Sequence, residues 1–336
     1  MSSPVIVPVD AAAPDAAVIA RAAEVIRRGG LVAMPTETVY GLAGNALSPE
    51  SIARIYAAKG RPAQNPLIAH VADAAQARSL AAEWPTMAQA LAERFWPGPL
   101  TLVVRRKATV PAALSAGLDT FGVRVPDHPV ALALIRACGL PLAAPSANRF
   151  TEVSPVTAAQ VARGLGGAVD LILDAGHTRV GIESSVVDVS GGRAVLLRPG
   201  SITREELEAV VGPVSRGAAP ARADAAQASP GMAARHYAPR ARVELLEPAE
   251  LSARLVGEPA SAATGLLLCT LAPELSWTPT MRVSLGADPA RYAAGLYDAL
   301  HEADERRCEV LLIERPPAGP GWDAIHDRLR RAAHPG

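Results

Sequence analysis

The feature that most constrains the fold is an alternation of short apolar runs with amphipathic stretches, which extends over residues 1–211. Residues 17–28 carry apolar side chains at helical spacing and are followed by Gly29 and Gly30, which are typical of a helix end. Residues 31–36 then form an apolar run that predicts a buried strand. An alternation of this kind indicates a mixed α/β domain.

The same reasoning predicts the remaining elements of this region. Further strands are expected at 67–71, 100–104, 121–125, 141–145, 170–174, 184–189 and 193–198. Further helices are expected at 49–58, 86–95, 128–137, 156–164 and 203–211. The last two strands flank Ser190, Gly191 and Gly192, which indicate a turn between them.

Residues 212–240 interrupt the pattern. They are rich in Pro, Gly, Ala and Ser and show no apolar periodicity, which predicts an interdomain linker. A second alternation of strands and helices occupies 241–336, and it predicts a small parallel, doubly wound sheet of Rossmann-like α/β type. The expected domains are therefore 1–211 and 241–336, joined by the linker.

Composition restricts the classes of function. The chain has 33 basic and 33 acidic residues, and this balance disfavours a general binder of nucleic acid or of anionic membranes, which needs a basic excess. Its three cysteines show no CxxC spacing, so neither a disulfide framework nor a cysteine-built zinc site is expected. The N-terminus lacks a signal-peptide pattern, and no stretch approaches the roughly 20 apolar residues of a membrane span. We expect a soluble cytoplasmic protein.

The familiar phosphate-binding and catalytic signatures are absent. The sequence has no GxxxxGK[ST] loop, no complete GxGxxG fingerprint, no GxSxG elbow and no HExxH pair. Polar segments instead stand next to predicted strands, which is where open α/β sheets bind ligands.

The first two of these segments each have two interpretations. Residues 35–41 place hydroxyls and a carboxylate on the turn after strand 31–36, which suits either turn chemistry or a site. Residues 59–66 begin with Lys59, which is either a solvated helix end or part of a phosphate clamp with Arg61. Only two of the 33 basic residues are lysines, and this rarity favours the clamp.

The remaining segments add a buried charge and short polar side chains. Arg124 lies within strand 121–125, and burying it requires a carboxylate partner, either internal or from a ligand. Residues 144–148, with Ser154 after them, form a cluster of short side chains suited to phosphate or ribose. Two more polar groups are found at 183–185 and 198–200.

Together these segments resemble a known family. The first domain contains, in order, PTETVYGLAGNA, KGRPAQNPLIAHV, FWPGPLTLVV, FGVRVPDHP, APSAN, ESSVVDV and LLRPGSI. This set is similar to the threonylcarbamoyl-AMP synthase family, whose YrdC-like fold is a twisted mixed sheet with helices. Residues 229–232 (SPGM) and 235–239 (RHYAP) resemble the linker signature of the family's two-domain form. The domain at 241–336 is included through its position after that linker.

The resemblance implies a reaction and its partners. L-threonine, bicarbonate or CO2 and ATP would give threonylcarbamoyl-adenylate and pyrophosphate. Other proteins would transfer the threonylcarbamoyl group to tRNA next to the anticodon, so little direct nucleic-acid binding is expected. Mg²⁺ would arrive with ATP, held by phosphates and water, with no metal site built from the protein and no organic cofactor.

The resemblance also implies site residues. The catalytic positions would be Lys59, Arg61, Ser146 and Asn148, which also bind ATP. Further nucleotide contacts would come from Asn65, Thr120, Ser154, Arg198 and Tyr237, with the linker around Tyr237 acting as a lid. Threonine would be held by Thr38, His70, Arg124, the backbone of Ala144 and Ser184. Glu37 is one candidate for the group that accepts the amine proton.

Two other functions compete with this interpretation. The first is a module that binds double-stranded RNA or tRNA, but the arginines are spread along the chain and matched by acids, which disfavours it. The second is a regulatory relative that keeps the fold without synthase activity. The intact KxR and SxN segments argue against that alternative.

Overall fold

A computed structural model describes residues 4–217, 227, 229–231, 234–256 and 261–335. The chain divides into two compact units. The first comprises Met1–Phe150, Ser154–Arg179 and Glu183–Met232. The second comprises Thr151–Val153, Val180–Ile182 and Ala233–Gly336.

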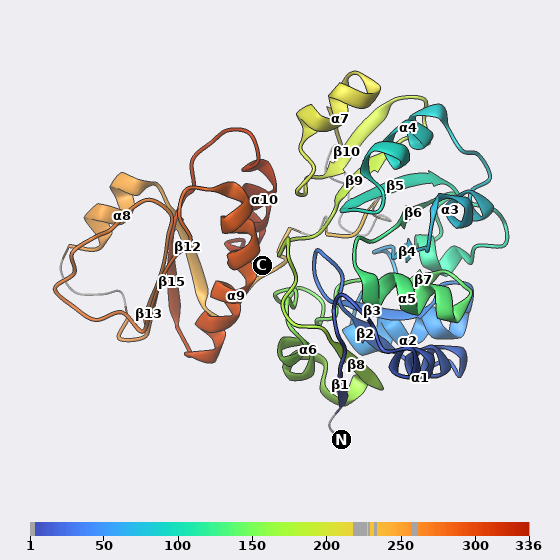
Figure 1. The fold of residues 1–336 in the computed structure, drawn as a ribbon. Helices are drawn as coiled ribbons and strands as arrows, with labels where there is room; N and C mark the ends of the chain where they lie inside the picture. The colour runs from blue at the N-terminus through green and yellow to red at the C-terminus, as the bar shows by residue number, and fades with distance from the viewer. Residues whose placement is uncertain (1–3, 218–226, 228, 232–233, 257–260, 336) are drawn as a thin grey trace. The chain divides into compact units, whose positions relative to one another are not determined.

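The described part of the first unit is built on one mixed sheet (Figure 1). Its strands are β1 (Val5–Pro8), β2 (Val32–Met34), β3 (Gly41–Asn45), β4 (Ile68–His70), β5 (Leu100–Arg105), β6 (Thr120–Arg124), β7 (Leu142–Ala143), β8 (Leu171–Asp174), β9 (Ser185–Asp188), β10 (Ala194–Arg198) and β11 (Val214–Arg216). Their order is β1-β8-β2-β3-β7-β4-β6-β5-β9-β10-β11. The sheet contains parallel pairs, such as β4 with β6, and antiparallel pairs, such as β5 with β6, so the predicted mixed sheet is confirmed.

Helices cover this sheet and create two cores. They are α1 (Ala16–Arg27), α2 (Pro49–Lys59), α3 (Ala74–Leu80), α4 (Thr86–Phe95), α5 (Pro129–Cys138), α6 (Ala158–Leu165) and α7 (Arg204–Val211). Successive side chains of a strand point to opposite faces. In β2, Ala33 therefore joins the core that contains residues of α2, α4 and α7, whereas Val32 and Met34 join the core formed with α1 and α5.

Local sequence explains where the helices begin and end. Ser48 accepts a hydrogen bond from Ser51 N, and Pro49 occupies the first turn of α2, as the sequence predicts. Gly60 ends the same helix at φ +60°, a conformation that costs glycine little. This left-handed turn leaves Lys59 as the last residue of the helix and redirects the chain into the 61–66 segment.

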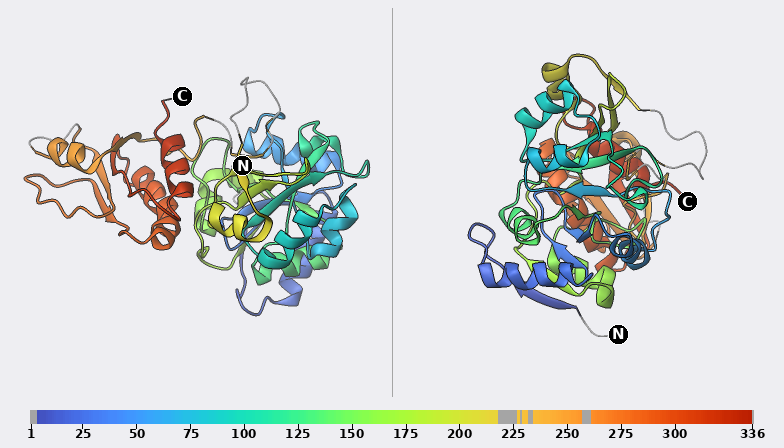
Figure 2. Two further views of the ribbon diagram at one scale, coloured as in Figure 1. Left: turned by 90° about the horizontal axis from the view of Figure 1, so that it is seen from above. Right: turned by 90° about the vertical axis from the view of Figure 1, so that its right-hand side faces the viewer.

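The second unit contains a small parallel sheet, as predicted. Its strands are β12 (Arg242–Leu246), β13 (Thr264–Leu268), β14 (Met281–Ser284) and β15 (Val310–Glu314), in the order β12-β15-β13-β14. Its helices are α8 (Pro248–Arg254), α9 (Pro289–Glu305) and α10 (Asp323–Ala332). Figures 1 and 2 show α8 on one face of the sheet and α9 and α10 on the other, which is the doubly wound arrangement.

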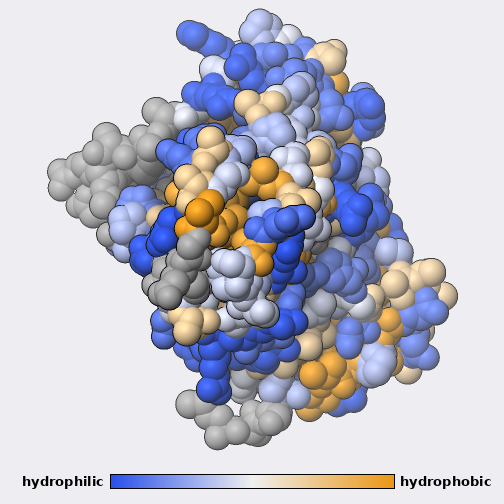
Figure 3. All heavy atoms as spheres, turned by 90° about the vertical axis from the view of Figure 1, so that its left-hand side faces the viewer, coloured by the Kyte–Doolittle hydropathy of each residue, from blue (hydrophilic) through white to orange (hydrophobic). Residues whose placement is uncertain are grey.

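The surface of the second unit carries a local apolar area. Figure 3 shows apolar side chains gathered among polar ones on the face turned to the viewer. The partly buried apolar side chains of this unit include Leu246, Leu271, Leu275 and Trp277, which pack against the cluster of Leu251, Leu266 and Leu312. Among the described residues, no helix combines the length and apolar character needed to cross a membrane.

The structure adds elements that the sequence pattern does not predict. Strand β3 begins at Gly41, the last residue of the 35–41 turn, and continues where no strand is predicted, because Gly41 and Gly44 lower its strand propensity. Strand β11 lies inside the predicted linker and pairs in parallel with β10, so the first unit extends beyond residue 211. Other linker residues, 218–226, 228 and 232–233, lie outside the described part of the chain.

A close backbone approach at Gly200 yields a testable prediction. A Cβ atom there would stand 2.2 Å from Ser185 N and 2.5 Å from the carbonyl carbon of Ser184. Gly200→Ala should therefore lower the free energy of unfolding by about 2 kcal/mol or more in urea titration, because backbone must move. Gly191→Ala, with no atom within 4 Å, should change it by less than about 0.5 kcal/mol. Equal effects of the two variants would contradict this explanation.

Candidate functional site

Lys59 joins the two segments that the sequence singles out for phosphate. Its side chain is only 2% exposed, so the interpretation as a solvated helix end is wrong. The Nζ atom donates to the carbonyl oxygens of Ser146 at 2.5 Å and Asn148 at 2.6 Å. Phe150 N in turn donates to the Lys59 carbonyl at 2.8 Å. The end of α2 is thereby fixed to the loop after β7.

Arg61 organises the loop that follows. Its Nε donates to Asn65 O at 2.9 Å, and its Nη2 donates to Asn65 Oδ1 at 2.5 Å and to Pro66 O at 2.8 Å. Tyr56 OH donates to Asn65 O as well, at 3.0 Å. The structure therefore brings Arg61 and Asn65 together, as predicted for one site, and it buries both.

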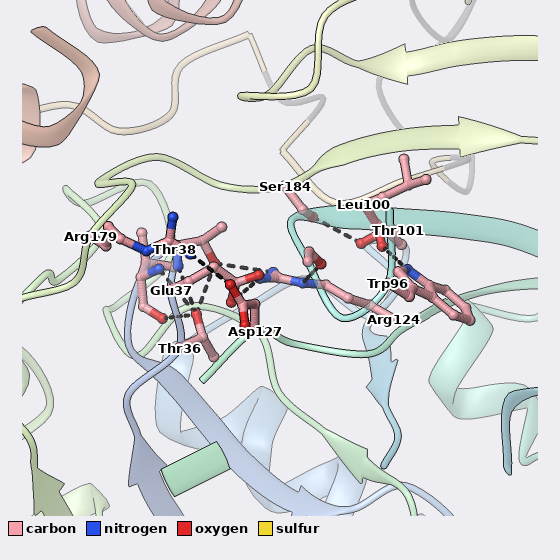
Figure 4. A network of polar contacts seen from close by, with 12 residues as sticks. Thr36, Glu37, Thr38, Trp96, Leu100, Thr101, Arg124, Asp127, Arg179 and Ser184 are labelled. Carbon is pink, nitrogen blue, oxygen red and sulfur yellow. Dashed lines mark hydrogen bonds and ion pairs between the residues drawn. The ribbon is translucent and has the colours of Figure 1, made fainter. Parts of the chain in front are cut away.

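The segment 35–41 serves both of the roles considered for it. Thr36 Oγ1 accepts hydrogen bonds from the backbone N–H groups of Thr38 and Val39 at 3.2 Å, which is turn chemistry. The side chains of Glu37 and Thr38 are also buried, but they point toward Arg124 (Figure 4). The turn thus aims a carboxylate and a hydroxyl at one guanidinium group.

Arg124 forms a buried ion pair with Glu37. Glu37 Oε2 lies 2.6 Å from Arg124 Nη2, with the two side chains 1% and 5% exposed, respectively. Arg124 Nη1 donates to Thr38 Oγ1 at 3.1 Å, and Nε donates to Gly98 O at 3.2 Å. The partner required by a buried arginine is therefore an internal carboxylate.

His70 lies beside this pair and is held neutral. It stands opposite Arg124 in the register of β4 and β6, and its Nδ1 lies 3.3 Å from Ile68 O. Burial lowers the pKa of His70 to about 3, and the positive charge of Arg124 adds to this effect. The site therefore contains a neutral imidazole next to a compensated cation.

Ser184 is fixed by two neighbours. Arg198 donates from Nε to Ser184 O and from Nη2 to Ser184 Oγ, each at 3.1 Å. Thr101 Oγ1 lies 2.9 Å from Ser184 Oγ. Arg198 Nη1 also donates to Pro230 O at 3.2 Å, which ties part of the predicted linker to the first unit. Sequence reasoning missed Thr101, although it is a polar residue within the apolar run LTLVV.

The other predicted positions occupy nearby parts of the first unit. Ser154 Oγ donates to Glu183 Oε1 at 2.6 Å, and both residues are buried. Ala144 N donates to Ile68 O at 3.2 Å. Thr120 lies in the lining of a pocket over the sheet, which also includes Pro66, Thr101, Phe121, Val186 and Pro230.

Tyr237 belongs to the second unit. It adopts φ +57°, is 1% exposed and stacks on Tyr297 of α9 with ring centroids 5.8 Å apart. The Arg328 guanidinium of α10 lies 5.1 Å from its ring centroid, a cation–π contact. These contacts fix the ring within its own unit. Its predicted contact with a nucleotide stays a prediction.

The first unit contains four buried cationic side chains at predicted positions. Lys59, Arg61, Arg124 and Arg198 are all buried, and each donates hydrogen bonds to carbonyl or hydroxyl oxygens. Fixed cations of this kind suit anionic ligands such as phosphates and carboxylates. In the part of the chain that the structure describes, no group of three or more His, Cys, Asp or Glu residues is placed to hold a metal ion.

The contrast between the two lysines can be tested directly. Lys59→Met should lower the free energy of unfolding by about 1–3 kcal/mol, because two buried carbonyl oxygens lose a charged donor. Lys107 is exposed and donates to Ser79 O, so Lys107→Met should cost less than about 0.5 kcal/mol. Denaturant titration of both variants checks this, and a similar cost for each would refute the structural role of Lys59.

His70 should also make stability depend on pH. Its folded-state pKa is depressed below the unfolded value of 6.5, so its contribution is complete above pH 6.5 and declines as pH falls toward 3. Between pH 7 and pH 5, the wild-type chain should lose about 2 kcal/mol more unfolding free energy than His70→Gln. An equal loss in both proteins would show that His70 protonates normally.

Comparisons with known proteins cover nearly the whole chain. The family model described as telomere recombination matches residues 24–200, and that of the threonylcarbamoyl-AMP synthase C-terminal domain matches residues 202–334. A threonylcarbamoyl-AMP synthase of Bacillus subtilis is 43% identical over 324 residues, covering 94% of this chain and 92% of the relative. One of Pyrococcus abyssi is 42% identical over 320 residues, covering 93% of each.

A solved structure is equally similar. The crystal structure of P. abyssi Sua5 complexed with L-threonine matches with a TM-score of 0.91 at 39% identity. The match covers 98% of this chain and 97% of the other. The similarity therefore includes both units and is not confined to the first.

Proposed function

The chain belongs to the threonylcarbamoyl-AMP synthase family, and on that premise we propose that it joins L-threonine, bicarbonate or CO2 and ATP into threonylcarbamoyl-adenylate and releases pyrophosphate. It is an enzyme of the nucleotidyltransferase type. The observation that carries the proposal is the near-complete match to a Sua5 structure complexed with L-threonine. The buried cations of the first unit support it, because the proposed substrates carry phosphates and carboxylates.

ATP would bind where the 59–66 and 146–148 segments meet. Lys59 and Arg61 would face the triphosphate, with Ser146 and Asn148 at the same place. Their contacts with backbone carbonyls hold the cations in position, so that little reorganisation is needed when phosphate binds. Further nucleotide contacts are proposed for Asn65, Thr120, Ser154 and Arg198.

Threonine would bind at the Arg124 cluster. Arg124 would take the α-carboxylate, and Thr38, His70, the Ala144 backbone and Ser184 would surround the rest of the molecule. A neutral His70 suits this role, since it accepts or donates a hydrogen bond without adding a charge. The Ser184 hydroxyl is already oriented by its contacts with Thr101 and Arg198.

The chemistry would depend on positioning rather than on a covalent nucleophile. The neutral threonine amine attacks CO2 and loses a proton, or attacks bicarbonate with loss of water, and either route gives the carbamate. A carbamate oxygen then attacks the α-phosphorus in line, and pyrophosphate leaves. A carbamate is labile in water, so enclosure of the site protects it. Mg²⁺ would be held by the phosphate oxygens of ATP and by water, and we assign no step to an ion bound by protein side chains.

The product would be used to modify tRNA, although this chain itself would not bind tRNA strongly. Threonylcarbamoyl-adenylate is an activated intermediate, and other proteins would transfer its acyl group to the adenosine beside the anticodon. The equal numbers of basic and acidic residues agree with weak tRNA binding by this chain, because strong tRNA binding requires a basic surface.

The proposed reaction can be measured with the full-length protein. Incubation with ATP, L-threonine, Mg²⁺ and ¹³C-bicarbonate should release pyrophosphate and form a ¹³C-containing threonylcarbamoyl-adenylate mass. Omitting threonine should abolish both signals. Pyrophosphate release that is independent of threonine, or none at any Mg²⁺ concentration, would refute the proposal.

The phosphate clamp gives a further prediction. Arg61→Ala should raise the KM for ATP by about 10- to 100-fold, because a fixed cation and a charged hydrogen bond are lost. Arg21→Ala, on the exposed side of α1, is the matched control and should leave the KM unchanged. An unchanged KM in both variants would exclude Arg61 from the ATP site.

A further inference from the structure

Neither carboxylate oxygen of Glu37 accepts a hydrogen bond from the described residues, and only one of them lies in the ion-pair contact. Oε2 forms the 2.6 Å ion-pair contact with Arg124, whereas Oε1 is buried and accepts no hydrogen bond from any residue that the structure describes. Leaving a buried acceptor unsatisfied is costly. A donor supplied by a ligand would remove that cost.

Two groups near Glu37, the Arg124 guanidinium and the His128 imidazole, make their hydrogen bonds to other atoms. Arg124 is engaged on other sides, since Nε donates to Gly98 O and Nη1 donates to Thr38 Oγ1. His128 Nδ1 accepts a hydrogen bond from Val130 N at 3.2 Å, and burial lowers its pKa although the charge of Glu37 opposes that effect. The acidic group of the pair thus remains able to accept from a ligand.

The pair has the charge pattern that complements an amino acid. Arg124 and Glu37 place a fixed positive and a fixed negative charge 2.6 Å apart. An α-amino acid carries a carboxylate and an ammonium on one carbon atom. Its carboxylate can therefore face Arg124 while its ammonium faces Glu37. A ligand with a carboxylate alone would leave the buried cluster with a net negative charge, which is unfavourable.

We propose that Glu37 binds the ammonium group of the substrate through Oε1, and that the Glu37–Arg124 pair thereby selects a zwitterionic α-amino acid. The inference rests on the proposed function, because it takes threonine as the substrate. It makes Glu37 a substrate-binding residue that determines specificity, in addition to neutralising Arg124.

Isothermal titration with two ligands tests this role. One ligand is L-threonine, and the other is its analogue in which a hydroxyl replaces the amine. The wild-type protein should bind threonine about 10- to 100-fold more tightly, since only the ammonium gives a charge-assisted hydrogen bond. Glu37→Gln should reduce this preference to within about threefold.

Asp127→Asn is the matched control for removing a carboxylate. Asp127 is exposed and pairs with Arg179 at 2.7 Å (Figure 4), so its loss should leave the preference unchanged. If Glu37→Gln does not unfold cooperatively, Glu37→Asp replaces it. This variant keeps a negative charge near Arg124 but withdraws the carboxylate by one methylene, and the preference should again fall.

The outcomes separate this inference from the proposed function. Wild-type protein that binds both ligands equally would overturn the role of Glu37 alone. A preference that persists in the Glu37 variant, or an equal weakening of both ligands, would also overturn it, because Glu37 would then only position Arg124. Wild-type protein that binds no threonine would contradict the proposed function and, with it, this inference.

Discussion

The buried ion pair between Arg124 and Glu37 is the interaction on which the candidate site depends. Taking two charges out of water is expensive, so the pair persists only where geometry and further hydrogen bonds compensate it. Here the turn at 36–39, the end of β6 and the Gly98 carbonyl supply that compensation from three parts of the chain. The depressed pKa of His70 follows from the same burial and from the same cation.

The remaining cations are fixed in a different way. Lys59 and Arg61 donate to backbone carbonyls, and Arg198 donates to Ser184 and to Pro230 O. Carbonyl oxygens orient a cationic side chain and hold it in place, and a cation fixed in this way favours an anionic ligand.

Much of this arrangement could be predicted from the sequence. Periodicity indicated most helices and the parallel sheet of the second unit, and the buried charge of Arg124 required a partner. Periodicity could not identify Glu37 as that partner, because Glu37 and Arg124 are 124 − 37 = 87 positions apart in the sequence and only the fold brings them together. Strand β3 was missed because glycine disfavours strands locally, yet Gly41 lies close to Ala144 in the sheet. Thr101 could not be identified as a site residue from the sequence, because it is a single hydroxyl residue within an apolar run.

Arg124 and Glu37 act as one unit in the folded protein, and a double-mutant cycle measures the coupling between them directly. The unfolding free energies of the wild type, Glu37→Gln, Arg124→Gln and the double variant would be obtained by denaturant titration. Each single change should cost about 3–5 kcal/mol, because it leaves an uncompensated buried charge. The double variant should cost less than the sum, with a coupling of about 1–3 kcal/mol. Additive effects, with a coupling near zero, would show that Arg124 and Glu37 contribute to stability independently.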